Sequence, residues 1–301
     1  MLSVLVWWLA IQGLALLALP IAYRLLRFLP DRGVSMARPV GLLLGGYGLW
    51  ILVTLGLLRN TTTGVVAVLA LIGLASALLL GRDGRSLGAF LRGARRQILV
   101  TEVLFALGLA GWAFFRAHNP EIAATEKPME YAFLNGILRS ETFPPRDPWL
   151  SGYGISYYYL GYVLMALLTR LTGLASAVTF NLTNATLFAL TLSGAYALAH
   201  NLAAARRARP AGGSWGAVAC GLLGGGLVAL VGNLEGIFEV LRARGWGSEA
   251  LFRWLDVRNL TVTPPSATWY PDDGWWWWRA SRIIHDRDAA GQSMEVISEF
   301  P

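Results

Sequence analysis

Charged side chains are scarce in this chain of 301 residues. They make up 14% of the sequence, whereas hydrophobic residues make up 55%. Ordinary soluble domains are about 25% charged, so this composition argues against a soluble globular fold.

Cysteine and histidine are also rare. The single cysteine, Cys220, lies in an apolar run, so no disulfide framework exists. The three histidines, His118, His200 and His285, lack the spacing of a zinc site. The formal charge of +7 comes from short basic clusters between apolar runs. These clusters are not interleaved with aromatic residues, so nucleic acid is not an expected partner.

The sequence contains several long runs of uncharged, mostly apolar residues. Most approach the roughly 20 residues that cross a bilayer core, and helices satisfy their backbone groups internally there. The sequence therefore predicts an all-α, polytopic transmembrane helical bundle of about seven spanning helices. The predicted spans are 2–23, 40–58, 64–81, 98–116, 155–172, 178–204 and 214–232.

Arginine clusters predict the orientation. Four arginines, Arg24 to Arg38, follow the first span, and five, Arg82 to Arg96, follow the third, so both segments should be cytoplasmic. The long loop 118–154 is then extracytoplasmic. Arg206, Arg207 and Arg209 conflict with this orientation. With seven spans, the loop that contains them would lie on the extracytoplasmic side. The uncharged run 171–205 is longer than one span needs, and a break inside it stays open.

The long outer loop is predicted to carry a flat interfacial helix at 128–140. Thr125 suits its N-cap and Pro128 its first turn. Met129, Phe133 and Ile137 form one apolar stripe, and the segment is too short to span.

This loop gathers the candidate catalytic carboxylates, Glu126, Glu130 and Asp147. Glu126 and Glu130 are one helical turn apart, a pair that suits a divalent cation or a general base. The alternative is that these acids only solvate an interfacial helix or pair with Lys127 and Arg139. Spacing alone favours this alternative.

Two aromatic segments are candidate substrate-binding regions. Tyr157, Tyr158 and Tyr159 precede the fifth predicted span, and a run of four tryptophans at 275–278 precedes Arg279 and Arg282. For the tyrosines, an interfacial aromatic belt is favoured over substrate contact. The same belt is the default interpretation of the tryptophans. Arginines near lipid headgroups are also suited to phosphate binding.

Six motifs follow one another in the second part of the sequence. They are Thr125-Glu126-Lys127-Pro128-Met129-Glu130, Phe143-Pro144-Pro145-Arg146-Asp147-Pro148-Trp149, the triple tyrosine with Gly161, the turn 232–236, the tryptophan run with Arg279, and 297–301. In this order they resemble the uncharacterised Chlor-Arch-YYY membrane family (domain of unknown function 2298) over about residues 98–301. The family usually has Asp where this chain has Glu130.

The resemblance implies two regions, an N-terminal three-helix membrane region at 1–97 and the family's domain at 98–301. The family continues further, so the domain is expected to be truncated at its C-terminus. Its layout is similar to type-C glycosyltransferases, which take sugars from polyprenyl-phosphate carriers. This is an analogy of layout, and a shared fold does not fix a function.

The function expected from this analogy is that of a membrane glycosyltransferase-like protein whose partners are membrane lipid and a polyprenyl-phosphate-linked sugar. Glu130 would be the base or metal ligand, assisted by Glu126 and Asp147, and the two arginines at 279 and 282 would hold phosphate. The cofactor stays open, with a divalent cation as candidate. The alternatives are a transporter or flippase-like carrier and a structural subunit. A carrier should show ionisable residues inside its spans, and the apolar runs are nearly free of them.

Overall fold

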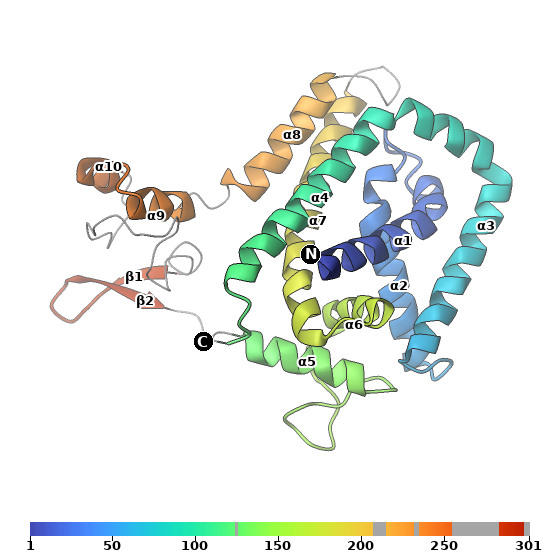
Figure 1. Ribbon diagram of the computed structural model, residues 1–301, viewed down its shortest axis with the longest axis horizontal. Coiled ribbons are helices and arrows are strands. Elements are labelled where there is room, and N and C mark those ends of the chain that lie inside the picture. The colour runs from blue at the N-terminus through green and yellow to red at the C-terminus, as the bar shows by residue number, and fades with distance from the viewer. Residues whose placement is uncertain (124–125, 207–214, 232–234, 255–282, 298–301) are drawn as a thin grey trace. The chain divides into compact units, whose positions relative to one another are not determined.

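The computed structural model describes residues 1–123, 126–206, 215–231, 235–254 and 283–297 (Figure 1). The chain divides into two compact units, Met1–Val228 and Ala229–Pro301. The helices of the first unit are α1 (Leu2–Leu25), the short 3-10 helix η1 (Val34–Met36), α2 (Ala37–Thr54), α3 (Thr62–Gly93), α4 (Arg95–His118), α5 (Lys127–Arg139), α6 (Leu160–Thr172), α7 (Ser176–Ala205) and α8 (Trp215–Ala229).

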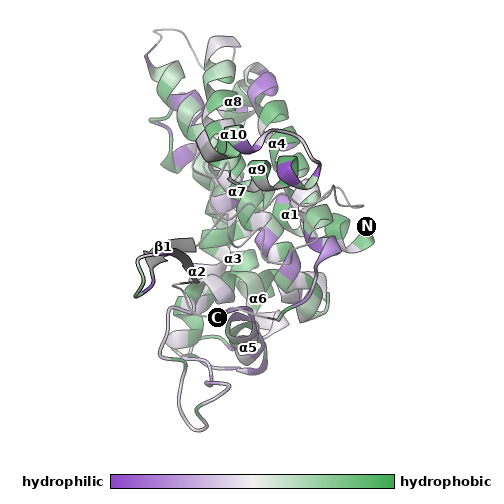
Figure 2. Cartoon of the chain, turned by 90° about the vertical axis from the view of Figure 1, so that its left-hand side faces the viewer, coloured by the Kyte–Doolittle hydropathy of each residue, from purple (hydrophilic) through white to green (hydrophobic). Residues whose placement is uncertain are grey.

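Among the residues that the structure describes, five helical segments are long and apolar enough to cross a membrane: α1, Val34–Thr54, α3, α4 and α7. They are predominantly coloured as hydrophobic in Figure 2. The prediction of a helical, multi-pass membrane protein is therefore confirmed, but the count of about seven spans is not. The predicted spans at 155–172 and 214–232 correspond to α6 and α8, which have only 13 and 15 residues.

The second unit contains α9 (Glu235–Ala243), α10 (Glu249–Trp254) and an antiparallel hairpin of β1 (Ile283–Arg287) and β2 (Ser293–Ile297). The hairpin departs from the all-α prediction. Its turn is held by Asp288, whose Oδ1 accepts hydrogen bonds from the backbone N–H groups of Ala290 and Gln292. Gly291, at φ +77°, takes the left-handed conformation that such a turn needs.

The basic segment that was predicted to be a loop after the third span is mostly helical. Helix α3 runs on to Gly93, and only Ala94 separates it from α4. Arg82, Arg85 and Arg92 therefore lie on the last turns of α3. Arg24 at the end of α1 forms an ion pair with Asp83 there (3.4 Å), so these two helix ends lie together.

Long-range hydrogen bonds define two ends of the first unit. At one end, which we call the Asp31 end, Gln97 Nε2 donates to Asp31 Oδ2 (3.0 Å), and the Asp31 backbone N–H donates to Asn201 Oδ1 (3.0 Å). The loop after α1, the start of α4 and the end of α7 meet there.

At the other end, which we call the α5 end, the end of α4 lies beside the start of α7, because Arg116 donates to Asn181. Asn60, before α3, donates through Nδ2 to the carbonyl oxygen of Ser140, just after α5 (2.8 Å).

Helix α6 begins and ends at the α5 end. Near its start, the ring of Tyr162 lies 5.9 Å from that of Phe133 on α5. Near its end, Arg170 Nη2 donates to the carbonyl oxygen of Leu138, also on α5 (2.8 Å). After the left-handed cap at Gly173, α7 starts at Ser176, which donates to Asn135 on α5 (2.9 Å). At about 20 Å, α6 is shorter than a bilayer core of about 30 Å.

This placement removes the conflict in the arginine count. Helix α7, rather than α6, returns the chain to the Asp31 end, so Arg206 lies at the same end as Arg24 and Arg95. The conflict arose because the segment 155–172 was counted as a crossing. Run 171–205 contains no long break, because α7 is continuous from Ser176 to Ala205.

Candidate functional site

Helix α5 supplies the first part of the site. The helix predicted at 128–140 is present at Lys127–Arg139, with Pro128 in its first turn. Its N-cap is Glu126 rather than Thr125, which lies outside the described residues. Phe133, Leu134 and Ile137 are buried against the core, and Met129 packs beside them, so the predicted apolar stripe is correct. Its flat orientation in a membrane interface stays a prediction.

Glu130 lies on the side of α5 that faces α6. The Tyr162 hydroxyl on α6 donates a hydrogen bond to its carboxylate. Burial raises the pKa of Tyr162 far above its usual range, and the negative charges of Glu130 and Glu126 raise it further. Tyr162 is therefore a neutral hydrogen-bond donor at physiological pH.

Tyr157 and Tyr158 complete this group. Their rings lie 4.0 Å apart, and Tyr158 is 80% exposed. The pKa of Tyr157 is raised first by its hydrogen bond with Tyr158, then by desolvation, and also by the charges of Glu126 and Glu130. We call Glu126, Glu130, Tyr157, Tyr158 and Tyr162 the carboxylate–tyrosine cluster.

Phe133 positions the aromatic side of the cluster. Its ring lies 5.5 Å from Trp149, 5.6 Å from Tyr157 and 5.9 Å from Tyr162. Aromatic pairs at these distances stabilise a packed arrangement. The loop after α5 is thereby held over the first two turns of α5.

Asp147 has a different place from the other two predicted carboxylates. Its Oδ1 accepts hydrogen bonds from the backbone N–H groups of Trp149 (2.8 Å) and Leu150 (2.9 Å). Its own N–H donates to the carbonyl oxygen of Tyr153 (2.9 Å). Asp147 therefore closes the turn that carries the exposed Trp149, and its predicted assisting role in chemistry stays a prediction.

The triple tyrosine is divided between two environments. Tyr157 and Tyr158 are exposed, whereas the Tyr159 hydroxyl accepts a hydrogen bond from Trp50 Nε1 on α2 (3.1 Å). The Tyr159 ring also lies 6.0 Å from Phe143. Of the three predicted substrate-binding tyrosines, Tyr159 thus packs between elements, and the other two are open to a ligand.

The remaining predicted site residues lie outside the described residues. They are Arg279, Arg282 and the tryptophan run at 275–278. Within the described ranges, no group of three or more His, Cys, Asp or Glu side chains is arranged to hold a metal ion. A divalent cation held by the pair Glu126 and Glu130 stays a prediction.

The family described as uncharacterized membrane protein (DUF2298) matches residues 44–301. This chain belongs to that family. The match includes α5, α6 and every residue of the carboxylate–tyrosine cluster. It begins before the predicted boundary at 97/98, so the division into 1–97 and 98–301 stays a prediction. No curated protein and no solved structure matches the chain.

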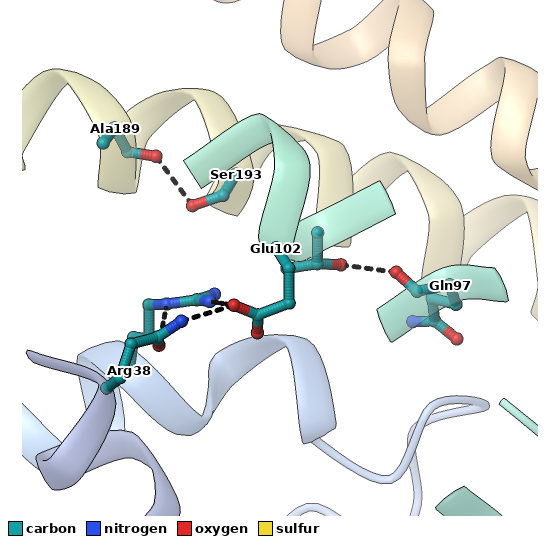
Figure 3. A network of polar contacts seen from close by, with 7 residues as sticks. Arg38, Gln97, Glu102, Ala189 and Ser193 are labelled. Atoms are coloured by element: carbon teal, nitrogen blue, oxygen red, sulfur yellow. Dashed lines mark hydrogen bonds and ion pairs between the residues drawn. The ribbon is translucent and has the colours of Figure 1, made fainter. Parts of the chain in front are cut away.

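This DUF2298 protein also has a charged network that the sequence analysis missed (Figure 3). Arg38, which was assigned to a polar loop, lies in the first turn of α2 and is 4% exposed. It forms an ion pair with Glu102 on α4, and its Nε donates to Gln12 Oε1 on α1 (3.0 Å). A charge inside a predicted span, as at Glu102, was the available signal.

A second missed group surrounds Asp31, which is fully buried. Its carboxylate accepts hydrogen bonds from the backbone N–H groups of Gly33 (2.9 Å) and Ser35 (3.2 Å), and from Gln97 Nε2. The Ser35 hydroxyl also donates to it. Four donors thus satisfy the carboxylate. In the sequence, Asp31 lies in a segment that resembles an ordinary turn, so nothing there pointed to this group.

Proposed function

We propose that this integral membrane protein is a glycosyltransferase-like enzyme that takes a sugar from a polyprenyl-phosphate carrier at the carboxylate–tyrosine cluster. The observation that supports this proposal is the pairing of Glu130 with Tyr162 beside Glu126, next to two exposed tyrosines. A half-buried carboxylate beside a fixed hydroxyl donor is suited to proton transfer. The tyrosine faces offer surfaces on which a sugar ring can stack.

Glu130 is assigned the role of general base. An acceptor hydroxyl attacks the anomeric carbon of the sugar, and its proton passes to the Glu130 carboxylate. The bond between the anomeric carbon and the phosphate oxygen breaks, and the electron pair leaves with the polyprenyl phosphate. Tyr162 holds the Glu130 carboxylate in place. Glu126 assists by charge or joins Glu130 as a ligand for a divalent cation.

The arginine distribution supports an extracytoplasmic location for the site. The Asp31 end carries the arginines at and after the end of α1, those on the last turns of α3 and at the start of α4, and Arg206. By the positive-inside rule this end is cytoplasmic, so the α5 end and its loop 118–154 face the other side. A site at this surface of the membrane can bind a polyprenyl-phosphate-linked sugar whose lipid chain lies in the bilayer.

Glu130→Gln in the full chain tests the proposal. The protein is reconstituted into liposomes with a panel of radiolabelled polyprenyl-phosphate hexoses, and sugar transfer to water or to an added glycan acceptor is measured. Removal of a general base should lower the rate about 100-fold or more. Glu141→Gln, an exposed acid at the same end, is the matched control. Equal transfer by wild type and Glu130→Gln would remove Glu130 from the reaction.

A flippase-like carrier is the second candidate, and the Arg38–Glu102 pair is the observation that favours it. Glu102 lies seven residues into α4, about 10 Å along the helix, inside an apolar span. Ionisable pairs at such positions are typical of carriers. Glu102→Gln should leave sugar transfer unchanged if the enzyme proposal is correct, whereas a carrier would lose lipid translocation between leaflets.

A further inference from the structure

Two basic residues lie beside the carboxylate–tyrosine cluster without a role in the proposal above. Arg116 is in the last turn of α4, and Lys127 is the first residue of α5. The last turn of α4 and the first turns of α7 are joined by hydrogen bonds from Arg116 to Asn181. The first turn of α5 joins them through Tyr131, whose hydroxyl lies 3.0 Å from Ser176 Oγ.

Arg116 is held by a neutral group. Its Nε donates to Asn181 Oδ1 (3.1 Å), and its Nη2 donates to the same oxygen. Asn181 Nδ2 in turn donates to the carbonyl oxygen of Pro120 (3.0 Å). Across the described part of the chain, no carboxylate lies within ion-pair distance of Arg116. The guanidinium is thus oriented while its charge is left for another anion.

Lys127 is close enough to Arg116 for their charges to repel. Burial lowers the pKa of Lys127, the charge of Arg116 lowers it further, and Glu121 partly offsets this. Two partly buried like charges cost free energy, and a bound anion offsets this cost. Ser176, the first residue of α7, contacts Tyr131 on α5 here, and the positive end of the α7 dipole favours an anion.

The acidic residues of the cluster lie on a different flank of α5. Lys127 and Tyr131 are four residues apart, and Tyr131 contacts Ser176 on α7. Glu126 and Glu130 are likewise four residues apart, and Glu130 bonds Tyr162 on α6. The first turns of α5 therefore present Lys127 towards α7 and the two carboxylates towards α6.

We propose that Arg116 and Lys127 bind the phosphate group of the lipid carrier, with Asn181 as the positioning residue for Arg116. This inference rests on the proposed function and deepens it. A phosphate held on the α7 flank places the attached sugar next to the α6 flank, where Glu130 and the exposed tyrosines lie. Arg116 is suited to bind two phosphate oxygens at once because its guanidinium is planar and already oriented.

Photolabelling of the full chain in phosphatidylcholine nanodiscs tests this inference. The probe is undecaprenyl phosphate with a photoreactive group, competed with undecaprenyl phosphate, undecaprenol or inorganic phosphate. We expect Arg116→Gln and Lys127→Gln each to lower labelling about 10-fold or more, and Lys127→Arg to retain most of it. Arg139→Gln, an exposed basic residue at the other end of α5, is the matched control and should label like wild type.

The outcomes separate the alternatives. Competition by undecaprenyl phosphate but not by undecaprenol supports a phosphate site for the lipid carrier. Equal competition by inorganic phosphate would assign the site to free phosphate and overturn the lipid assignment. Equal labelling of wild type, Arg116→Gln and Lys127→Gln would overturn the site. If Arg116→Gln fails to fold, Lys127→Gln, which lies outside the spans, decides alone.

The same assay distinguishes this inference from the proposed function. Glu130→Gln should retain photolabelling while it loses sugar transfer, because Glu130 faces α6 rather than the phosphate. Loss of labelling in Glu130→Gln would overturn the division of α5 into two flanks. Normal transfer by Glu130→Gln together with loss of labelling in Arg116→Gln would refute the proposed base and support the phosphate site.

Discussion

The two ends of the first unit both contain carboxylates, but they use them differently. At the Asp31 end, Asp31 is completely buried and four donors satisfy its carboxylate. At the α5 end, Glu126 and Glu130 are only partly buried, and the hydrogen bond described for Glu130 comes from one tyrosine. A completely buried carboxylate held by four donors joins the elements around it. A partly buried carboxylate near the surface can be reached by a proton, a cation or a substrate.

The largest expected effect is a difference in cysteine labelling between the α5 end and the Asp31 end, which should lie on opposite sides of the membrane. In a Cys220→Ala background, a cysteine at Tyr158 should react with an impermeant reagent added to intact cells, because Tyr158 is exposed at the α5 end. A cysteine at Arg206 should react only after the membrane is opened. Labelling of both positions from outside would mean that α7 does not separate the two ends by a membrane.

The next prediction tests whether Asp31 is structural. Asp31→Ala would leave several buried donors without an acceptor, so we expect the free energy of unfolding to fall by about 3 kcal/mol or more. Thermal unfolding in detergent measures this. Asp83→Ala, which breaks an ion pair with the exposed Arg24, is the control and should cost at most about 1 kcal/mol. An equally small effect of Asp31→Ala would show that the hydrogen bonds to the Asp31 carboxylate do not stabilise the fold.

A smaller loss of stability is expected where α6 packs against α2. A Cβ at Gly46 would overlap Leu164 Cδ2 and lie 3.3 Å from the Leu164 Cα, so Gly46→Ala must displace the Leu164 side chain and press against the α6 backbone. The cost should be about 1–3 kcal/mol, measured as a lower unfolding temperature. Gly13→Ala is the control because a Cβ there meets nothing within 4 Å. Equal stability of both variants would contradict the close contact of α6 with α2.

The smallest expected effect is the pH dependence of the α5 end. Because the pKa of Tyr162 is raised in the folded protein, its neutral form stabilises the fold at pH values below the ordinary tyrosine pKa of 10.0. This stabilisation should be lost as the pH rises above about 10, where the unfolded chain ionises its tyrosines first. Tyr162→Phe should show a shallower loss in unfolding experiments between about pH 9 and 11. An identical slope would contradict the raised pKa.

Hydropathy and local motifs predicted the helical membrane class, the family, and a short helix at 128–140. They could not show where the apolar segment 155–172 becomes helical, so it was counted as a full span. In the structure α6 is too short to span, and it packs against α2 and α5. Contacts between distant residues were equally inaccessible. Glu130 is bonded to Tyr162, and Arg38 to Glu102, and neither pair follows a helical or strand period in the sequence.

The short length of α6 also has a consequence for how the protein is made. A segment of 13 residues is too short to be retained in a bilayer as a stop-transfer sequence. With the orientation proposed above, it would cross the membrane together with the preceding loop during synthesis, and it can dock only after α2 is in place to receive it. Insertion of this region thus depends on tertiary packing against an earlier helix, so substitutions at Gly46 should lower the yield of correctly inserted protein as well as its stability.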